Sequence, residues 1–459
     1  MQDSPHKYPE TDEDPFTVAL SGDVMLTRRV SACREPAFLK LVQALRDADA
    51  TCVNLETCVR WWEEGTPSIT TGTPMTTTPD LLSELRWLGV DVVTCANNHV
   101  YDYGENGVLA MLRHLRDAGI PQAGCGRNLY EARLPAYAET ARGRVGFVAM
   151  TSTFRPWNAA SNSRGEVAGR PGVNPLRHTA QHHVDSDCFD ALLRMSRGLG
   201  FAKEQERART HFFSDKEIGC ETTDVMTLFG QTICRSDRFE TLTETPEAEL
   251  DVQRRWIAEA RGQCDILVVS LHTHEFAGRS LKKESLKVNL SEPADFIRQA
   301  AHAAIDAGAD IVAGHGSHTA LGVEIYKGRP IFYSLGGLIF QNETLPFVPA
   351  EAYERFDLGP DATPSNLFDA RTKHDTKGFP AYAGYWECFV PVCHFKQGQL
   401  ASIDIIPTDL GYGQPRHRRG RAMWADGAQA AKILSRVAAL SKDLGTRVEI
   451  SGGVGRIEL

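Results

Sequence analysis

Side chains that can hold a metal ion or move a proton follow five short apolar runs in this 459-residue sequence. The run Phe16–Ser21 leads to Asp23, and each of the other runs leads to a small group of carboxylate, amide or imidazole side chains. These groups are Asn54 with Glu56, Asn97 with Asn98 and His99, His272 with His274 and Glu275, and His315 with His318. Ligands of an open α/β sheet bind beyond the carboxyl ends of its strands, so the pattern predicts one site built from all five groups.

The mixture of oxygen and nitrogen donors suits a divalent ion of hard or borderline character, such as zinc, manganese, iron, calcium or magnesium. We therefore predict a divalent metal ion and no organic cofactor. Each group alone has a common structural explanation, for example a turn at Gly22-Asp23. The occurrence of all five at strand ends is what favours a functional site.

Two kinds of chemistry fit such a set of side chains. In phosphoester hydrolysis, a pair of metal ions activates water and holds the leaving oxygen. In proton transfer next to a carbonyl group, a base lies near one face of the carbon and an acid near the other. The second chemistry is favoured by the surplus of imidazoles over carboxylates: His99, His272, His274 and His318 beside Asp23 and Glu56.

The elements that must position these residues alternate between strand and helix patterns. Short apolar runs predict strands at 16–21, 50–55, 90–95, 145–150, 265–271 and 310–313. Apolar periodicity predicts helices at 37–47, 81–88, 104–118, 248–261, 294–307 and 427–444. This alternation predicts an α/β fold.

The same patterns divide the chain into five parts. We expect a disordered or extended tail at 1–15, the first part of a core at 16–151, and the second part at 247–345. Between them, 152–246 is polar and reads as a largely helical insertion or lid, either a groove for a peptide or a surface excursion. The last part, 346–459, reads as a loop region followed by strands and a helix that complete the core.

Two smaller motifs have alternative interpretations. The basic run 415–421 is interpreted as a solvated face rather than a carboxylate or phosphate site. Trp61 and Trp62 are interpreted as anchors of a loop, with stacking on an aromatic group of a substrate as the less favoured alternative.

Composition excludes several classes of protein. The formal net charge of -9 argues against a dedicated binder of nucleic acid or anionic membranes. The sequence has neither a secretory signal pattern nor a run of about 18 apolar residues, so we expect a cytoplasmic protein without a membrane partner. Its 11 cysteines include no C-x-x-C pair, which argues against a zinc ribbon.

The order of the five groups resembles the calcineurin-like metallophosphoesterases, and more closely their CapA branch, which is linked to poly-γ-glutamate production. The strings GDVMLTR (22–28), ANNHVYDYG (96–104) and GHGSHTALGVEIYKGRPIFYSLGGLIF (314–340) carry this resemblance. It implies a four-layer αββα sandwich with the site at one edge of the sheets. It also implies the metal ligands, which would be Asp23, Asn54, Glu56, Asn98, His272, His315 and His318, with His99 facing the substrate.

The sequence departs from the superfamily pattern at several of these positions. The usual Asp-x-His is Asp23-Val24-Met25, and the bridging Asp is replaced by Asn54-Leu55-Glu56. His272-Thr273-His274-Glu275 stands where the CapA branch has His-Trp-Gly, and Gly337 where it has Asn. These departures favour a single or weakly held ion over a tight dinuclear centre.

The chain is also similar, in architecture and size, to the peptide epimerases of lasso-peptide pathways. That resemblance implies a metal-assisted epimerase that inverts a Cα of a ribosomal precursor peptide, possibly its C-terminal tryptophan. The predicted catalytic residues are His99, His272, Asp23, Glu56 and His274, and the predicted substrate-binding residues are Asn97, Asp102, Arg28 and Glu275. Asp102 is also expected to orient His99.

Two alternatives stay open. The first is a metallophosphoesterase, or a CapA-like enzyme of poly-γ-glutamate synthesis or processing. The second is a non-catalytic binding protein that kept the fold. The predicted partner is a peptide substrate, with no nucleic acid.

Overall fold

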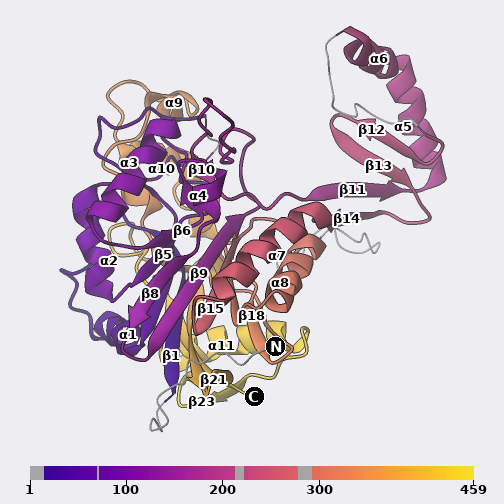
Figure 1. Cartoon of the computed structure of the whole chain (residues 1–459). Coiled ribbons are helices and arrows are strands. Elements are labelled where there is room, and N and C mark those ends of the chain that lie inside the picture. The colour runs from indigo at the N-terminus through magenta and orange to yellow at the C-terminus, as the bar shows by residue number, and fades with distance from the viewer. Residues whose placement is uncertain (1–14, 70–71, 212–221, 278–291) are drawn as a thin grey trace. The chain divides into compact units, whose positions relative to one another are not determined.

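The computed structural model describes residues 15–69, 72–211, 222–277 and 292–459 (Figure 1). Within them the chain forms two compact units. The first comprises the described parts of 1–176, 251–274 and 301–459, and the second those of 177–250 and 275–300. Of the predicted tail 1–15, all but Pro15 lies outside the described residues.

The first unit contains a ten-stranded mixed sheet with the order β23-β24-β21-β20-β1-β2-β5-β6, in which β19 also pairs with β1 and β22 with β21. Its strands are β1 (Phe16–Met25), β2 (Ala50–Leu55), β5 (Val92–Thr94), β6 (Gln122–Ala123), β19 (Gly337–Phe340), β20 (Glu387–Lys396), β21 (Gln399–Asp409), β22 (Met423–Trp424), β23 (Glu449–Ser451) and β24 (Val454–Glu458). β1 is parallel to β2 and β19, and β2 is parallel to β5.

A second sheet of the same unit has the order β17-β18-β16-β15-β9-β8. Its strands are β8 (Ala136–Thr140), β9 (Gly143–Thr151), β15 (Ile266–His272), β16 (Ile311–His315), β17 (Val323–Tyr326) and β18 (Arg329–Phe332). β15 lies between β9 and β16, parallel to both. The two sheets agree with the predicted α/β class.

The side chains of β1 contribute to two hydrophobic clusters, one on each face of the larger sheet. Val18 and Leu20 of β1 join a buried cluster with Phe147 and Val268 of the second sheet, so the two sheets pack face to face. Ala19 points the other way, into a cluster shared with helices, because successive side chains of a strand face opposite sides.

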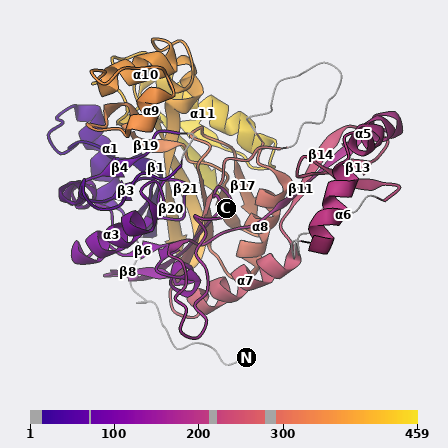
Figure 2. The same ribbon diagram turned by 90° about the horizontal axis from the view of Figure 1, so that it is seen from above.

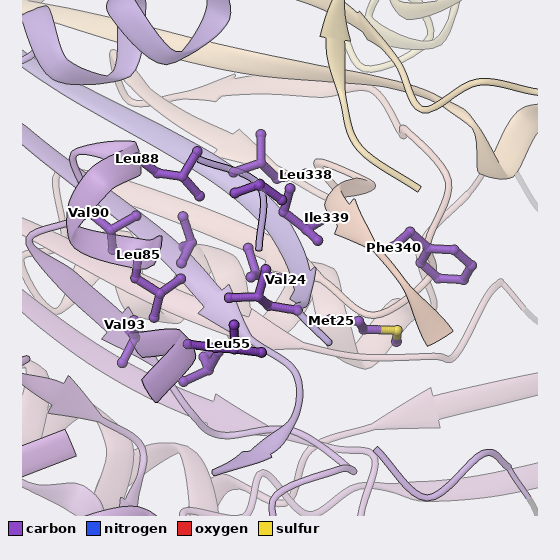
Figure 3. Close-up of a cluster of buried hydrophobic side chains, with 14 of the residues drawn as sticks. Val24, Met25, Leu55, Leu85, Leu88, Val90, Val93, Leu338, Ile339 and Phe340 are labelled. Atoms are coloured by element: carbon purple, nitrogen blue, oxygen red, sulfur yellow. The ribbon is translucent and has the colours of Figure 1, made fainter. Parts of the chain in front are cut away.

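Three helices form the layer on that other side: α1 (Pro36–Asp47), α2 (Leu82–Leu88) and α3 (Gly104–Asp117). Each contributes a buried apolar stripe, such as Phe38, Leu41 and Leu45 of α1. Figures 1 and 2 show the three helices along one side of the sheet. Figure 3 shows part of the cluster, with Leu85 and Leu88 against residues of β1, β2, β5 and β19.

The fourth layer of the αββα sandwich stays a prediction. The helices α7 (Glu247–Arg261) and α8 (Asp295–Asp306) precede β15 and β16 in sequence, but both straddle the boundary between the units. The remaining elements of the first unit are α4 (Leu129–Arg133), α11 (Gly427–Lys442), and two small pairings, β3 (Cys58–Val59) with β4 (Thr76–Thr77) and β7 (Cys125–Gly126) with β10 (Gly172–Val173).

The segment 346–385, predicted as a loop region, contains two short helices, α9 (Ala350–Glu354) and α10 (Pro364–Thr372). Thr363 begins α10 with a capping box to Asn366, a signal that the sequence carries. Four turns of 3-10 helix also occur: η1 (Pro79–Leu81), η2 (Asn342–Thr344), η3 (Phe379–Ala381) and η4 (Ala383–Tyr385).

The basic run 415–421 is not the solvated face that we predicted. Arg419 is 4% exposed and pairs with Glu343 and Asp375, each at 2.7 Å. Arg416 is also largely buried and pairs with Asp369 at 2.8 Å. A run of basic residues stays solvated only where no carboxylates pack against it. Here the segment 343–375 supplies such carboxylates, so these arginines are paired and partly buried.

The second unit corrects the prediction of a largely helical insertion. It contains α5 (Ser186–Gly198) and α6 (Phe201–His211), but also a four-stranded sheet with the order β12-β13-β11-β14. The strands are β11 (Thr179–Val184), β12 (Val225–Leu228), β13 (Gln231–Arg235) and β14 (Glu240–Glu244). Their side chains are mostly half-buried and often polar, so the alternation of apolar residues is weak.

The bounds of this unit also differ from the predicted 152–246. It begins at 177 and includes a second segment, 275–300. A role as a lid or peptide groove stays a prediction. Among the residues that the structure describes, no helix has the length and apolar character needed to span a bilayer.

Candidate metal centre

The carboxyl ends of β1, β2, β5, β15 and β16 bring members of all five predicted groups together, His274 and His318 included. The pairing places Asp23 beside Asn54 on neighbouring strands and His272 beside His315. β1 is irregular at Asp23, where its register shifts against both β2 and β19. Gly22 permits this, because a Cβ at that position would lie 1.9 Å from the carbonyl oxygen of Gly336.

Asp23 is fully buried and is held by three partners. Its Oδ1 accepts a hydrogen bond from Asn54 Nδ2 at 2.8 Å, and its Oδ2 lies 2.9 Å from His318 Nδ1 and 3.3 Å from the Gly316 amide nitrogen. Burial by itself raises the pKa of Asp23, but the hydrogen bond and charge of His318 outweigh it and lower that pKa below its usual range. Asp23 is therefore an anion at neutral pH.

Glu56 is fully buried, and neither of its carboxylate oxygens has a hydrogen-bond partner among the described residues. Imidazole nitrogens surround it instead: His272 Nε2 lies 3.6 Å from Oε1, and His318 Nδ1 lies 3.8 Å from Oε2. Burial, and then the charge of Asp23, raise the pKa of Glu56. An isolated buried carboxylate is costly unless a cation compensates it.

The donor atoms around Glu56 fit such a cation. Two sets of side chains each place one donor atom within 4.8 Å of the others: Asp23, Glu56 and His272 in one set, and Glu56, His274 and His318 in the other. We call these two sets, which share Glu56, the ligand cluster. A carboxylate with two free oxygens between two donor sets is placed to bridge them. The residues therefore fit a divalent metal ion, whose identity the donors do not fix.

His272 and His274 of the ligand cluster are in the form that binds metal. Burial lowers the pKa of His272 well below its usual range and that of His274 to about 3. Both rings are therefore neutral at pH 7, as metal ligation requires. His318 has a left-handed backbone (φ 55°), a strained conformation for a residue other than glycine.

His99 and Asp102 form a buried pair beside the ligand cluster. His99 Nδ1 lies 2.6 Å from Asp102 Oδ2, which also accepts a hydrogen bond from the Met75 amide at 2.6 Å. Burial raises the pKa of Asp102, and the charge of His99 opposes this. The pair fixes a proton on Nδ1 and leaves Nε2 facing Glu56 Oε1 at 3.8 Å.

The prediction that His315 is a metal ligand stays a prediction, because His315 is not part of the ligand cluster. Its Nδ1 lies 3.1 Å from the Ser270 hydroxyl, and its Nε2 lies 3.2 Å from the Ser21 carbonyl oxygen, to which it donates. Both ring nitrogens are thus occupied. His315 ties the ends of β1, β15 and β16 together.

The three predicted asparagines form an amide network. Asn97 Nδ2 donates to Asn54 Oδ1 at 3.1 Å, and Asn98 Oδ1 lies 2.8 Å from His272 Nε2. Asn97 Oδ1 also accepts from the His99 amide at 3.1 Å. In this arrangement the amides orient Asp23, His99 and His272. The ligand roles of Asn54 and Asn98, and the substrate role of Asn97, stay predictions.

Two predicted substrate-binding residues have their contacts elsewhere. Arg28 donates its backbone N–H to Gln341 Oε1 at 3.1 Å and a guanidinium N–H to the Arg419 carbonyl at 3.5 Å. Glu275 belongs to the second unit, where its charge acts on His178.

Aromatic residues beside the ligand cluster were not predicted from the sequence. The rings of Phe340 and Phe379 each lie 5.4 Å from that of His318, and Phe379 continues to Tyr385 at 4.8 Å. Phe340 is part of a motif quoted above. Phe379 and Tyr385 lie in a segment with no periodicity, so no signal marked them.

Comparison with known sequences reveals a family match. A family described as bacterial capsule synthesis protein PGA_cap matches residues 17–342. The uncharacterized protein y4sH of Sinorhizobium fredii is 32% identical over 97% of this chain and 94% of its own length. The probable polyglutamine synthesis accessory protein Rv0574c of Mycobacterium tuberculosis is 27% identical over 57% of this chain and 48% of its own length.

The capsule biosynthesis protein CapA of Bacillus anthracis is 21% identical over 73% of this chain and 62% of its own length. Among solved structures, a phosphatase from Mycoplasma pneumoniae aligns over 86% of this chain and 93% of its own, with 9% identity and a TM-score of 0.38.

Proposed function

Because the chain belongs to the bacterial capsule synthesis protein family PGA_cap, we propose that it is a metal-dependent hydrolase that cleaves an amide bond in a peptide or γ-glutamyl chain. Relatives named for capsule and polyglutamine synthesis support an amide-linked polymer as the substrate class. The single observation that carries the proposal is Glu56, a buried carboxylate that two sets of donors share and that has no hydrogen-bond partner in the described part of the chain.

The ligand cluster and the His99–Asp102 pair divide the work. Asp23, Glu56, His272, His274 and His318 would hold the metal. When bound, a divalent ion would polarise the scissile carbonyl and activate water. Asp102 holds His99 so that Nε2 is the basic nitrogen. His99 then takes a proton from the attacking water and gives it to the leaving nitrogen, so that the proton removed in the first step is used in the second.

Electrostatics supports this division. Asp23 is anionic, and His272 and His274 are neutral at pH 7, so each of these three side chains offers a cation a free electron pair. A divalent cation is the partner that such a buried set requires. His99 Nε2 lies 3.8 Å from Glu56 Oε1, and His99 Nδ1 pairs with the Asp102 carboxylate at 2.6 Å, which suits a group that gains and loses a proton.

The test is cleavage by protein loaded with Mn²⁺ or Zn²⁺. Poly-γ-glutamate, a mixed α-peptide library and bis(p-nitrophenyl) phosphate would be incubated separately and products followed by mass spectrometry. We expect new amine termini from one of the amide substrates, their loss with EDTA, and their loss in the Glu56→Gln variant. Cleavage of the phosphodiester alone would make the protein a phosphoesterase, and amide cleavage that survives EDTA would refute metal dependence.

A peptide epimerase is the second candidate. The observation that favours it is the number of imidazoles around one carboxylate, since proton exchange at a Cα needs a base near one face of the carbon and an acid near the other. The same incubation in D₂O separates the two. Uptake of one deuterium at a Cα of an uncleaved peptide would replace the hydrolase proposal with the epimerase.

A further inference from the structure

A pocket of about 460 Å³ lies in the first unit, away from the residues of the ligand cluster. Six of its lining residues are apolar or aromatic: Trp62, Pro67, Tyr103, Phe347, Val348 and Pro349. Arg60 and Gly65 complete the lining. Its volume falls in the usual range for a small-molecule or side-chain site. We call it the Trp62 pocket.

Trp62 and Phe347 are more exposed than loop anchors would be. Their exposed fractions are 38% and 62%, and their rings meet edge to face at 4.8 Å. Exposed aromatic groups that gather at a concave site mark a binding surface more often than single exposed residues do. The interpretation of Trp62 as a loop anchor therefore gives way to the alternative, stacking on an apolar group of a ligand.

Other contacts anchor the loop instead. Arg60 is 5% exposed, and its Nη1 donates to the carbonyls of Trp61, Trp62 and Glu64 at 3.0, 2.7 and 3.1 Å. Its guanidinium lies 3.5 Å from the centre of the Tyr103 ring. Gly65 allows the loop to lie against Tyr103, because a Cβ there would be 2.5 Å from the Tyr103 carbonyl oxygen. The walls of the pocket are therefore built without a ligand.

Two of the three chain segments that line the pocket are next in sequence to residues of the candidate site. Tyr103 directly follows Asp102, and the Asp102 carbonyl accepts a hydrogen bond from the Ser68 amide at 2.8 Å. Arg60 is four residues after Glu56, so their Cα atoms are at most about 14 Å apart. A peptide that reacts at the ligand cluster can thus place a side chain a few residues away in the Trp62 pocket.

We infer that the Trp62 pocket is a substrate subsite for an apolar side chain of leucine or phenylalanine size, within about four residues of the reacting bond. The inference rests on the proposed function for the identity of the reacting bond. It selects a peptide of mixed sequence over a homopolymer of glutamate, because carboxylate side chains gain nothing from an apolar pocket.

The test separates binding in the pocket from turnover. Saturation-transfer NMR on the full chain in EDTA would use N-acetyl-phenylalaninamide, N-acetyl-leucinamide and N-acetyl-glutaminamide as probes. We expect transfer to the first two and little to the third. Trp62→Ala and Phe347→Ala should each weaken binding at least about tenfold, the effect of removing a central aromatic contact.

Trp61→Ala is the matched control, since Trp61 has nearly the same exposure (39%) but does not line the pocket. It should change binding less than about twofold. No transfer to the apolar probes, or equal loss in Trp61→Ala and Trp62→Ala, would overturn the subsite. All three variants replace exposed residues, and thermal unfolding curves would verify that they fold.

Proximity to the ligand cluster is tested with Mn²⁺. In Mn²⁺-loaded protein, we expect paramagnetic broadening of the signals of the bound apolar probe. We expect no such broadening in the Trp62→Ala variant. Binding without broadening, in protein shown to hold Mn²⁺, would overturn the link between pocket and reacting bond. Because the EDTA experiment needs neither metal nor catalysis, its result stands even if the protein proves not to be a hydrolase.

Discussion

Glu56→Gln is expected to remove the response of stability to metal without destabilising the metal-free protein. In the absence of an ion, the Glu56 carboxylate is fully buried, lacks hydrogen-bond partners and lies near the buried Asp23 anion. Glutamine keeps the shape of the side chain and cannot ionise, so the metal-free variant should unfold at the same temperature as wild type or higher.

The magnitude for wild type follows from binding linkage. A single ion at a concentration of 100 times its dissociation constant stabilises the folded state by about 2.7 kcal/mol. For domains of 150–250 residues, about 1 kcal/mol shifts the midpoint by about 2–4 °C, and the first unit is larger, so its shift per kcal/mol is smaller. Scanning calorimetry with and without Mn²⁺ or Zn²⁺ should therefore show a rise of about 3–5 °C in wild type and almost none in Glu56→Gln.

Glu84→Gln provides the control, because Glu84 is also buried but is fully engaged. Its Oε2 accepts from the Val30 and Ser31 amides at 2.9 and 2.7 Å. This variant should lose about 1–3 kcal/mol of stability and keep the metal response. An unchanged metal response in Glu56→Gln, or a large loss of stability in its metal-free form, would refute the reasoning.

Three further predictions concern other parts of the first unit. Asp102→Asn should lower kcat by about 10²–10⁴-fold with unchanged metal affinity by equilibrium dialysis; an equal loss of both would mean that His99 helps to hold the ion. Arg419→Met takes from the buried Glu343 its partner at 2.7 Å and leaves it the longer contact with Arg416 at 3.6 Å. It should cost about 1.5–3 kcal/mol in urea unfolding, against less than about 0.5 for the exposed Arg418→Met. The hydrogen bond from His394 lowers the pKa of Asp404, so its contribution is present above the unfolded pKa and is lost as pH falls through the folded one. Asp404→Asn should therefore be less stable than wild type at pH 7, by about 1 kcal/mol, and the difference should shrink below about pH 4; a gap that persists at pH 2 would contradict this.

The strand ends were the part of the site that the sequence could predict. Ala50–Leu55 is β2 as predicted, and Asp23, Glu56, His272, His274 and His318 do meet at one edge. Buried parallel strands read as continuous apolar runs, and their carboxyl ends share an edge, so polar residues that follow them converge.

Which members of the set face the ligand cluster could not be predicted. His315 stands in a motif that resembles a ligand pair, yet Ser270 and the Ser21 carbonyl occupy its ring. That outcome depends on the register between β1, β15 and β16, which residue types do not reveal. The prediction of a largely helical insertion was wrong for a different reason. The strands of the second unit bury neither face fully, so the alternation of apolar and polar residues that identifies a strand is weak there.

The most direct test of the central claim is a crystal structure of the protein loaded with Mn²⁺ or Zn²⁺, with anomalous difference maps to locate the ion. We predict a peak whose ligands include a Glu56 oxygen together with imidazole nitrogens of the ligand cluster. A peak elsewhere, or a Glu56 carboxylate that stays without an ion at saturating metal, would contradict the account.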